Sequence, residues 1–499
     1  MNPAIVIVGV GLYTILMFAI GYWGFSKARP SMEDFFLGGR TLGLFVITCT
    51  VWSTLFSAYT YIGLPGAYYR SGISFFGVAG NVVLNSICMY FLGTRMWALG
   101  KKRGYINATD LLADRYGSNL VCGLAVLISI ASLLPYLGAQ IKGAGLTLQG
   151  VTNSVIPLEM GILYVTIVVL VYVVLGGFRS VVWTDVIQTV IMLVGLLGAM
   201  WIVADKVAGG LPGVIQKAAA INPNLVQFPG PTATWIPTMI LTQAIALGVG
   251  GFAWPQISQR MYATKSLKTV KTLAFIFPIA ALFANVPVIF LGLAGRIQYP
   301  NIQNPDTIMP TMLSELVPPV FAIIVILAIM AAIMSTVSGM MLSLTSIVVR
   351  DLWVRFFEPQ SATEARITNV SRLALVVIVA GALAFVFWGP STLVGYLIDA
   401  SGPIMLQVVA VLFGALYWRR ATKEGAIASM VVSELFFLCL WQKWIVMPAW
   451  GIHNAVWAMV VGWVLFIAVS LVTKPQPKEM LDEFYSPFEP EKPRERVPA

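Results

Sequence analysis

Three hydroxyl side chains stand close together inside a long apolar stretch of the chain. They are Ser335, Thr336 and Ser338, within the sequence AAIMSTVSGMML at residues 331–342. The surrounding residues 318–349 include no charged side chain and are mostly aliphatic. Hydroxyl oxygens in such a stretch are typical of an ion or solute pathway, or of a tight contact between helices.

On a helix Ser335 and Ser338 share a face, and the carbonyl of Ala332 lies one turn before Ser335. These oxygens, with carbonyls from an unwound partner helix, could hold a small hard cation. Calcium normally recruits several carboxylates and this stretch has none, so neutral oxygens favour a monovalent ion. The alternative is a packing seam of small residues from Ser335 to Gly339.

The elements that must position these hydroxyls are membrane helices. Hydrophobic residues make up 58% of the 499 residues, charged residues only 10%, and the mean hydropathy is +0.85. Apolar stretches of about 18 or more residues recur along the chain, each able to cross a hydrocarbon core about 30 Å thick. Because every backbone amide in lipid needs an internal partner, we expect helices rather than strands. The expected spans, about thirteen, lie near 3–25, 44–69, 72–98, 119–149, 157–175, 180–204, 235–259, 270–295, 318–349, 368–389, 393–417, 421–442 and 452–473.

Two of these spans, the second and the seventh, carry residues that break helices near mid-membrane. Interrupted helices at corresponding places in two halves are typical of inverted-repeat transporters, with the binding site at the interruption. Kinks and close packing through small residues are the alternative. The residues expected to interrupt the helices are Gly63, Pro65 and Gly66, and Gly248, Gly250, Gly251 and Pro255.

The basic residues predict the orientation of the chain. With the N-terminus outside, the loops that face the cytoplasm hold about 25 of the 31 Lys and Arg residues. An odd number of spans then places the C-terminus inside the cell. The net charge of +10 is interpreted as cytoplasmic loops beside anionic membrane lipid, not as a nucleic-acid surface.

Five stretches, one of which contains the hydroxyl cluster, make the chain similar to a known family: it resembles the sodium/solute symporters, which include bacterial proline, sialic acid, pantothenate and sugar symporters. The pairing of TLFSAYTYIGLPGAYY with AAIMST looks closest to the pantothenate branch, and Leu55 stands where proline symporters carry an aspartate. The resemblance implies thirteen helices with a five-plus-five inverted repeat of the leucine-transporter type. The stretches are DFFLGGR (34–40), YIGLPGAYY (61–69), GGFRSVVWTDVIQ (176–188), PQISQRMYA (255–263) and AAIMSTVSGMMLSLTSIVVRDL (331–352).

The resemblance also implies a sodium site between the second and ninth helices. Its ligands map to the carbonyls of Ser53 and Phe56 and to Ala332, Ser335 and Thr336. Some family members bind a second sodium through a sixth-helix aspartate and further ninth-helix serines.

For that second site Asp185 and Ser338 match, but the next serine position is Gly339 here. Asp185 has an alternative interpretation, as an acid in the first turn of a helix close to Arg179.

Solute contacts in this family come from the second, third, fourth, seventh and eleventh helices. The candidates here are Ser57, Thr60, Gln140, Gln243 and Phe252. A charged residue, Lys142, also lies in the fourth apolar stretch. It could meet a solute carboxylate or extend towards outer water.

The expected function is sodium-coupled symport of a small organic solute into the cell, with pantothenate-like, amino-acid-like and monocarboxylate solutes all open. Alternatives are a channel or sensor on the same scaffold, or coupling to protons or potassium. A membrane enzyme would need clustered His and Asp or an acidic pair, which the sequence lacks, since His453 is its single histidine.

One transporter domain is expected over residues 1–473, with the inverted-repeat core at about 44–417, and a disordered cytoplasmic tail over 474–499. We expect a monomer in the cell's inner (plasma) membrane. Its partners are then the solute, the sodium ion and membrane lipid.

Overall fold

The computed structural model of the chain describes residues 3–29, 31–152, 154–357, 363–388, 400–448 and 450–488. These residues are almost entirely helical, and apart from an isolated β-bridge between Leu42 and Thr264 they contain no strand. Two expected features, the start of the 393–417 span and the tail beyond residue 488, lie wholly or partly outside the described residues.

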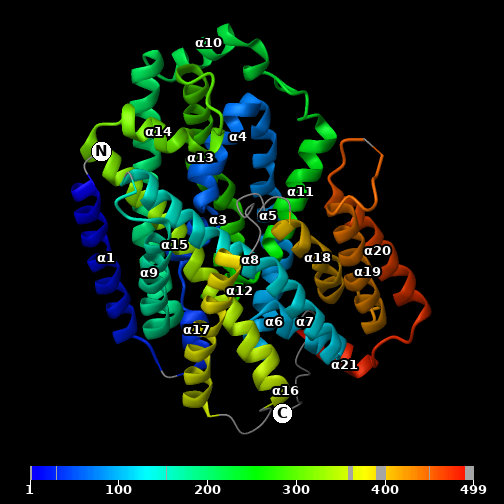
Figure 1. The fold of residues 1–499 in the computed structure, drawn as a ribbon. Coiled ribbons are helices and arrows are strands. Elements are labelled where there is room, and N and C mark those ends of the chain that lie inside the picture. Colours follow the sequence, from blue (N-terminus) through cyan, green and yellow to red (C-terminus); the bar gives the residue numbers. More distant parts are fainter. Residues whose placement is uncertain are drawn as a thin grey trace, which may run out of the picture.

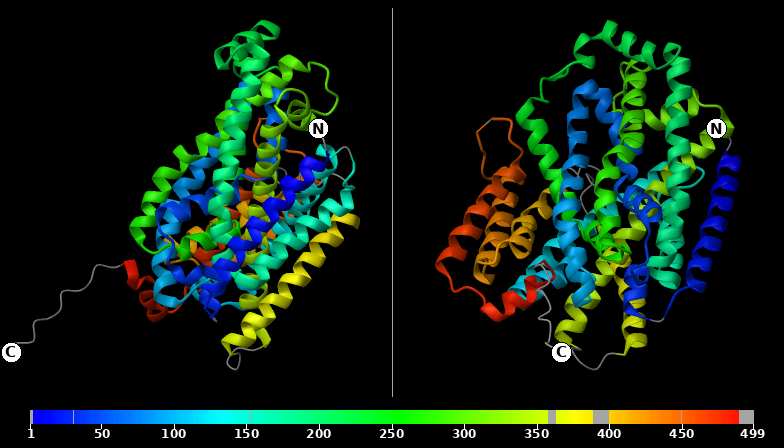
Figure 2. Two further views of the ribbon diagram at one scale, coloured as in Figure 1. Left: turned by 90° about the vertical axis from the view of Figure 1, so that its left-hand side faces the viewer. Right: turned by 180° about the vertical axis from the view of Figure 1, so that it is seen from behind.

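Most of the longer helices lie side by side, with α1 at one edge of the molecule and the α19–α20 hairpin at the other (Figure 1). The short helix α10 lies at one end of the bundle, and α16 and α21 lie at the opposite end, as Figure 2 also shows. The longer elements are α1 (Pro3–Ser26), α3 (Leu44–Leu55), α5 (Asn81–Cys88), α6 (Thr94–Arg103), α7 (Ala108–Tyr116), α8 (Asn119–Val151), α9 (Leu158–Ala208), α10 (Leu211–Ile221), α11 (Pro237–Ala253), α12 (Pro255–Ala263), α13 (Leu267–Gln298), α15 (Pro319–Ser346), α17 (Glu364–Trp388), α18 (Gly402–Tyr417), α19 (Lys423–Trp441) and α20 (Asn454–Val472).

Shorter elements connect the longer ones or extend their ends. They are α2 (Met32–Leu37), η1 (Gly38–Arg40), η2 (Tyr59–Gly63), α4 (Leu64–Ser71), η3 (Gly72–Gly80), η4 (Met89–Gly93), η5 (Pro223–Val226), η6 (Pro305–Thr307), α14 (Ile308–Glu315), η7 (Ile347–Val354), α16 (Arg355–Phe357), α21 (Lys478–Tyr485) and η9 (Ser486–Phe488).

Among the described residues, nine helical segments are long and apolar enough to cross a membrane, or ten if the bent pair α11 and α12 counts as one span. The helix α9 has 51 residues, which at 1.5 Å per residue is about 76 Å, more than twice the hydrocarbon thickness. Gly177, with φ 54° and ψ −142°, breaks it between the two spans expected at 157–175 and 180–204. The polytopic all-α fold is confirmed, while the count of about thirteen spans stays a prediction.

The helix with the hydroxyl cluster, α15, is the most deeply buried of these segments and packs against α9, α8 and α3. Every residue from Ala328 to Ser346 is buried. Its polar side chains are therefore surrounded by protein rather than by lipid.

Both broken helices differ in detail from the prediction. The first break lies at Phe56 and Ser57, seven residues before Gly63, and Gly63 and Pro65 lie in the helical turns η2 and α4. A π-helical stretch precedes Pro65, because a wider turn accommodates a proline ring that cannot donate a hydrogen bond. The predicted interruption at Gly63, Pro65 and Gly66 is therefore wrong in position.

The second break lies at Trp254, where α11 and α12 meet at 53° and Pro255 begins the new helix. The preceding glycines are helical and serve close packing. A Cβ on Gly248 would lie 2.3 Å from the carbonyl oxygen of Asn81, and one on Gly250 would lie 2.2 Å from that of Gly402. The prediction holds for Pro255 and not for the glycines.

The tail also differs from the prediction of disorder over 474–499. Residues 478–485 form α21, whose side chains Leu481, Phe484 and Tyr485 are buried. The Tyr485 hydroxyl donates to the carbonyl of Ala415 at 2.8 Å and accepts from Arg115 Nε at 3.2 Å. Apolar side chains at positions 481, 484 and 485, three and four residues apart, give this short helix one apolar face that can pack.

Candidate functional site

The end of α3 and the middle of α15 meet through hydroxyl groups. Phe56, with φ −94° and ψ 100°, leaves the helix, so the last carbonyls of α3 lose their usual amide partners. The Ser335 hydroxyl donates to the carbonyl of Ser53 at 2.8 Å, and the Thr336 hydroxyl donates to that of Thr54 at 3.3 Å. The two contacts join residues 282 positions apart in the chain.

A third backbone oxygen completes this cluster. Ser335 and Thr336 also donate to the carbonyl of Ala332, at 3.1 and 2.9 Å, and all three residues have no exposed surface. A hydroxyl can donate or accept, so these groups can turn their lone pairs to a small cation. We call Ser53, Thr54, Ala332, Ser335 and Thr336 the oxygen cluster.

Of the predicted first-site ligands, the structure brings Ser53, Ala332, Ser335 and Thr336 together and places Phe56 at the break. The ring of Phe56 lies 4.8 Å from that of Trp52, and the hydrogen bonds to α15 come from its neighbours. Sequence reasoning missed Thr54. The signal was available, because successive carbonyls at a helix end point the same way.

Asp185, on α9, contacts α3 at Thr50, one helical turn before Ser53 and Thr54. Its environment differs from that of the oxygen cluster. Its Oδ2 accepts from the hydroxyl of Thr50 and from Arg260 Nη2 at 3.2 Å, and both charged side chains are fully buried. Arg260 also donates to Thr50 Oγ1 at 3.0 Å and to the carbonyl of Gln256 at 2.6 Å. We call Thr50, Asp185 and Arg260 the charged triad.

The alternative interpretation of Asp185, as an acid in the first turn of a helix close to Arg179, is wrong, because Asp185 lies in the interior of α9, eight residues after the break at Gly177. Arg179 instead makes a bidentate contact with Asp34, at 2.6 to 2.9 Å. A closer basic residue on α12, Arg260, takes its place because the bend at Trp254 directs α12 towards α3.

Ser338 is joined to the oxygen cluster rather than to Asp185. Its hydroxyl donates to the carbonyl of Ser335 at 2.9 Å. At the neighbouring position a Cβ on Gly339 would lie 3.3 Å from Arg260 Nη2, so glycine leaves room for the guanidinium. No hydrogen bond among the described residues joins Ser338 to Asp185, although Asp185 Oδ1 has no partner there.

Two of the predicted solute-binding residues, Ser57 and Gln140, contact each other at the first break. Gln140 Oε1 accepts from the amide of Ala58 at 3.2 Å, and its Nε2 donates to Ser57 Oγ at 3.4 Å. Tyr136 donates to the same Ser57 oxygen at 3.4 Å, and its ring centre lies 5.7 Å from that of Trp254. Both helix breaks therefore meet at this point.

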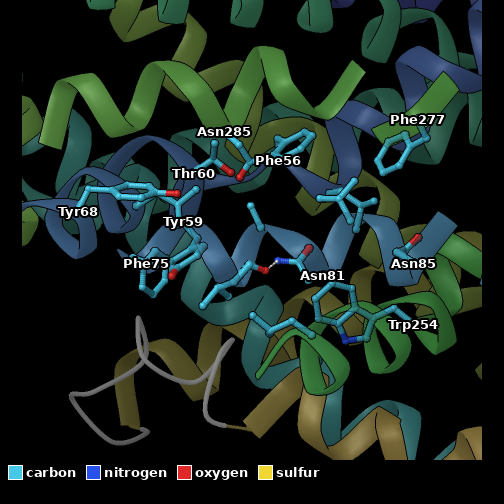
Figure 3. A pocket seen from close by; sticks show the side chains of 16 residues that line it. Phe56, Tyr59, Thr60, Tyr68, Phe75, Asn81, Asn85, Trp254, Phe277 and Asn285 are labelled. Atoms are coloured by element: carbon cyan, nitrogen blue, oxygen red, sulfur yellow. Dashed lines mark hydrogen bonds between the residues drawn. The ribbon is translucent and has the colours of Figure 1, made fainter. Parts of the chain in front are cut away.

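A cavity of about 90 Å³ lies beside them (Figure 3). Thr60 lines it, whereas Gln243 and Phe252 lie on α11 outside its lining, buried at 5% and 0% exposure. Sequence reasoning missed most of the lining, although Asn81 and Asn85 stand four residues apart on one face of an apolar helix. The aromatic and amide residues of the lining are Phe56, Tyr59, Tyr68, Phe75, Asn81, Asn85, Trp254, Phe277 and Asn285.

A larger cavity of about 360 Å³ lies on the other side of Tyr59, which lines both. It is bounded by Tyr136 and Gln140 on α8 and by η6 and α14. A Cβ on Gly63 would lie 2.4 Å from the Tyr59 ring, so the ring lies directly on this glycine between the two cavities.

An oxygen cluster at a helix break, beside an uncharged cavity, is the arrangement of an ion-coupled transporter. The model of the Sodium:solute symporter family matches residues 35–433. The chain belongs to this family. It is a sodium-coupled solute symporter and not an enzyme.

Relatives of this symporter cover almost its whole length. It is 28% identical to the sodium/pantothenate symporter of Escherichia coli, over 87% of this chain and 90% of the relative. It is 27% identical to the osmoregulated proline transporter OpuE of Bacillus subtilis, over 94% and 95%.

Among solved structures, it is similar to a Na⁺-coupled sialic acid symporter in a substrate-bound outward-open state, with a TM-score of 0.80 and 19% identity over 94% and 98% of the two chains. This similarity confirms the leucine-transporter type of fold.

Proposed function

We propose that this symporter binds its coupling sodium at the oxygen cluster, with Phe56 contributing its carbonyl, and its solute in the adjacent cavity. The observation that carries the proposal is the contact of Ser335 with the carbonyl of Ser53 at the end of a broken helix. Neutral oxygens suit a monovalent ion, and burial in protein removes competing water.

Coupling follows from the order of residues along the chain. Ser53 faces the proposed ion, Ser57 lies at the break, and Thr60 lines the cavity one turn later. An ion that fixes the end of α3 therefore also fixes the wall of the solute cavity. If sodium raises the affinity for solute, solute raises the affinity for sodium by the same factor.

The membrane potential adds to the driving force. One charge moving through about 100 mV supplies roughly 2.3 kcal/mol, which corresponds to about fifty-fold accumulation of the solute. The N-terminus then lies outside and the C-terminus in the cytoplasm, as the positive loops indicate, and the symporter works as a monomer in the inner membrane. Residues 1–473 form its transporter domain, with the repeat core at about 44–417.

The solute is a small neutral, zwitterionic or monocarboxylate molecule, because the described residues that line the cavity carry no charged side chain. The relatives named for pantothenate and proline transport support this size and polarity. Leu55, which also lines the cavity, offers no carboxylate to a solute.

A sodium gradient across proteoliposomes tests the ion site. Ser335→Ala with Thr336→Ala removes both cluster hydroxyls, and we expect sodium-driven solute uptake to be abolished while the protein stays folded and inserted. Solute uptake that keeps its sodium dependence in this double variant would refute the site.

The matched control is Ser343→Ala with Thr345→Ala. Both control hydroxyls lie buried on the same helix, and among the described residues they bond only within it, to the carbonyls of Met340 and Met341 at 3.1 and 2.7 Å. Loss of uptake in the control as well would mean that α15 tolerates no loss of hydroxyls. Replacing sodium by potassium or by a proton gradient tests the alternative ions.

A further inference from the structure

Three asparagines on two helices line the cavity beside the break. Asn81 and Asn85 lie one turn apart on α5, and Asn285 lies on α13. Figure 3 shows Asn285 beside Thr60 at one wall, and Asn81 and Asn85 along the opposite helix. All three are neutral, so they can recognise a ligand only through hydrogen bonds.

The hydrogen bonds of these side chains fix which way each amide is turned. Asn81 Nδ2 donates to the carbonyl of Val78 at 2.9 Å, Asn85 Nδ2 to that of Gly248 at 3.2 Å, and Asn285 Nδ2 to that of Ala281 at 3.0 Å. A backbone carbonyl only accepts, so the atom that faces it must be the nitrogen in each case.

Each amide oxygen is therefore left as an acceptor. The Oδ1 atom of Asn85 is buried and has no hydrogen-bond partner among the described residues. A buried acceptor without a donor is unfavourable, and a ligand that brings a donor removes that cost.

The remaining walls favour the same kind of ligand. Six rings line the cavity, and the negative faces of aromatic rings attract N–H groups and cations. Among the residues that the structure describes, the lining contains no Lys, Arg or His that could pair with a carboxylate. A carboxylate, which only accepts hydrogen bonds, would therefore meet neutral donors alone, among them the indole N–H of Trp254, which is buried and has no partner among the described residues.

We propose that this cavity selects its solute by hydrogen-bond donors, namely the hydroxyl, amide N–H or ammonium groups of a neutral or zwitterionic molecule. Asn85 and Asn285 accept from these donors. A carboxylate on the solute, where there is one, does not contribute to recognition by the cavity. The inference rests on the proposed function, because it takes this cavity as the solute site.

Matched pairs of solutes test the inference. The measurement is how strongly each solute stimulates the uptake of ²²Na⁺ into proteoliposomes. L-Proline and N,N-dimethyl-L-proline have the same charge and differ in their N–H donors. D-Pantothenate and D-panthenol differ in the carboxylate, which is an alcohol in panthenol. We expect dimethylation to weaken stimulation by about tenfold or more, and loss of the carboxylate to change it by less than about threefold.

Variants separate recognition from a structural role. In Asn85→Ala and in Asn285→Ala we expect the preference for the N–H-bearing solute over its methylated partner to fall towards one, whereas a merely structural defect would weaken both solutes equally. The control is Gln407→Ala, a buried amide outside the cavity whose Nε2 also donates to carbonyls, at 3.1 Å, and whose Oε1 also has no partner in the part of the chain that the structure describes. Its preference should not change.

Two results would overturn the inference. If methylation has no effect while loss of the carboxylate abolishes stimulation, the solute is read through its acid group, and the symport proposal stands. If no member of the panel stimulates sodium entry through the unaltered protein, the proposed solute site falls and the inference falls with it.

Discussion

Successive turns of α3 contact two buried polar centres that differ in charge. Thr50 belongs to the charged triad, in which a carboxylate and a guanidinium lie 3.2 Å apart with no exposed surface. Ser53 and Thr54, one turn later, belong to the oxygen cluster, where every member is neutral. In the triad the positive charge is the guanidinium of Arg260. In the oxygen cluster the carbonyl oxygens accept hydrogen bonds from the hydroxyls of Ser335 and Thr336 instead.

This difference separates a fixed cation from an exchangeable one. Charges buried in protein are tolerated only when they are paired and hydrogen-bonded, so Arg260 cannot leave Asp185 without leaving an uncompensated charge. The hydroxyls of Ser335 and Thr336 can rotate and offer lone pairs with little cost. The oxygen cluster is therefore the better candidate for an ion that binds and leaves in every transport cycle.

The largest effect is expected from breaking the triad. Arg260→Gln should lower the free energy of unfolding by about 3–5 kcal/mol, because it leaves Asp185 charged and unpaired in the protein interior. The double variant Asp185→Asn with Arg260→Gln should recover a large part of that loss, since no charge remains. Thermal unfolding in detergent measures both.

Strict additivity of the Asp185→Asn and Arg260→Gln effects would contradict this pairing, because contacting residues are expected to couple. It would also remove the distinction between a charged and a neutral centre.

The hydroxyls of the oxygen cluster could be predicted from the sequence, but the position of the helix break could not. The hydroxyls at Ser335 and Thr336 stand out because they interrupt an apolar run, and the family resemblance implies their contact with the broken second helix. The break itself could not be placed, because Gly63 and Pro65 attract attention while Phe56 and Ser57 carry no helix-breaking signal. Their conformation depends on contacts from α8 and α15.

The charged triad shows why partners of buried charges are hard to predict. Asp185 and Arg260 lie 75 residues apart, and Arg179 is the nearer basic residue along the chain. The bend at Trp254 decides the partner, and the size of that bend is a tertiary property. The cavity asparagines were missed for another reason, namely that single uncharged polar residues are common in membrane helices.

A moderate effect is expected at Thr50, which contacts both charges. Thr50→Val keeps the shape of the side chain but removes a donor to Asp185 and an acceptor for Arg260. We expect a loss of about 1–3 kcal/mol in the free energy of unfolding, with the sodium concentration for half-maximal uptake unchanged.

The matched control for this variant is Thr147→Val, whose buried hydroxyl bonds, among the described residues, only to the carbonyl of Gly143 on its own helix, at 2.8 Å. A large rise in the half-maximal sodium concentration for Thr50→Val alone would show that the triad belongs to the ion site.

The smallest effect is expected at Gly339, which lies beside Arg260 of the charged triad and Thr54 of the oxygen cluster. A Cβ there would lie 3.3 Å from Arg260 Nη2 and from a methyl group of Thr54, so Gly339→Ala should cost about 1 kcal/mol through crowding. Gly339→Ser supplies the hydroxyl that the family resemblance implies for a second sodium site. With Arg260 already beside Asp185, we expect the Hill coefficient for sodium to stay near one in both variants. A coefficient that rises towards two in Gly339→Ser, but not in Gly339→Ala, would mean that Asp185 accepts an exchangeable ion despite its arginine and that the charged triad is a second ion site.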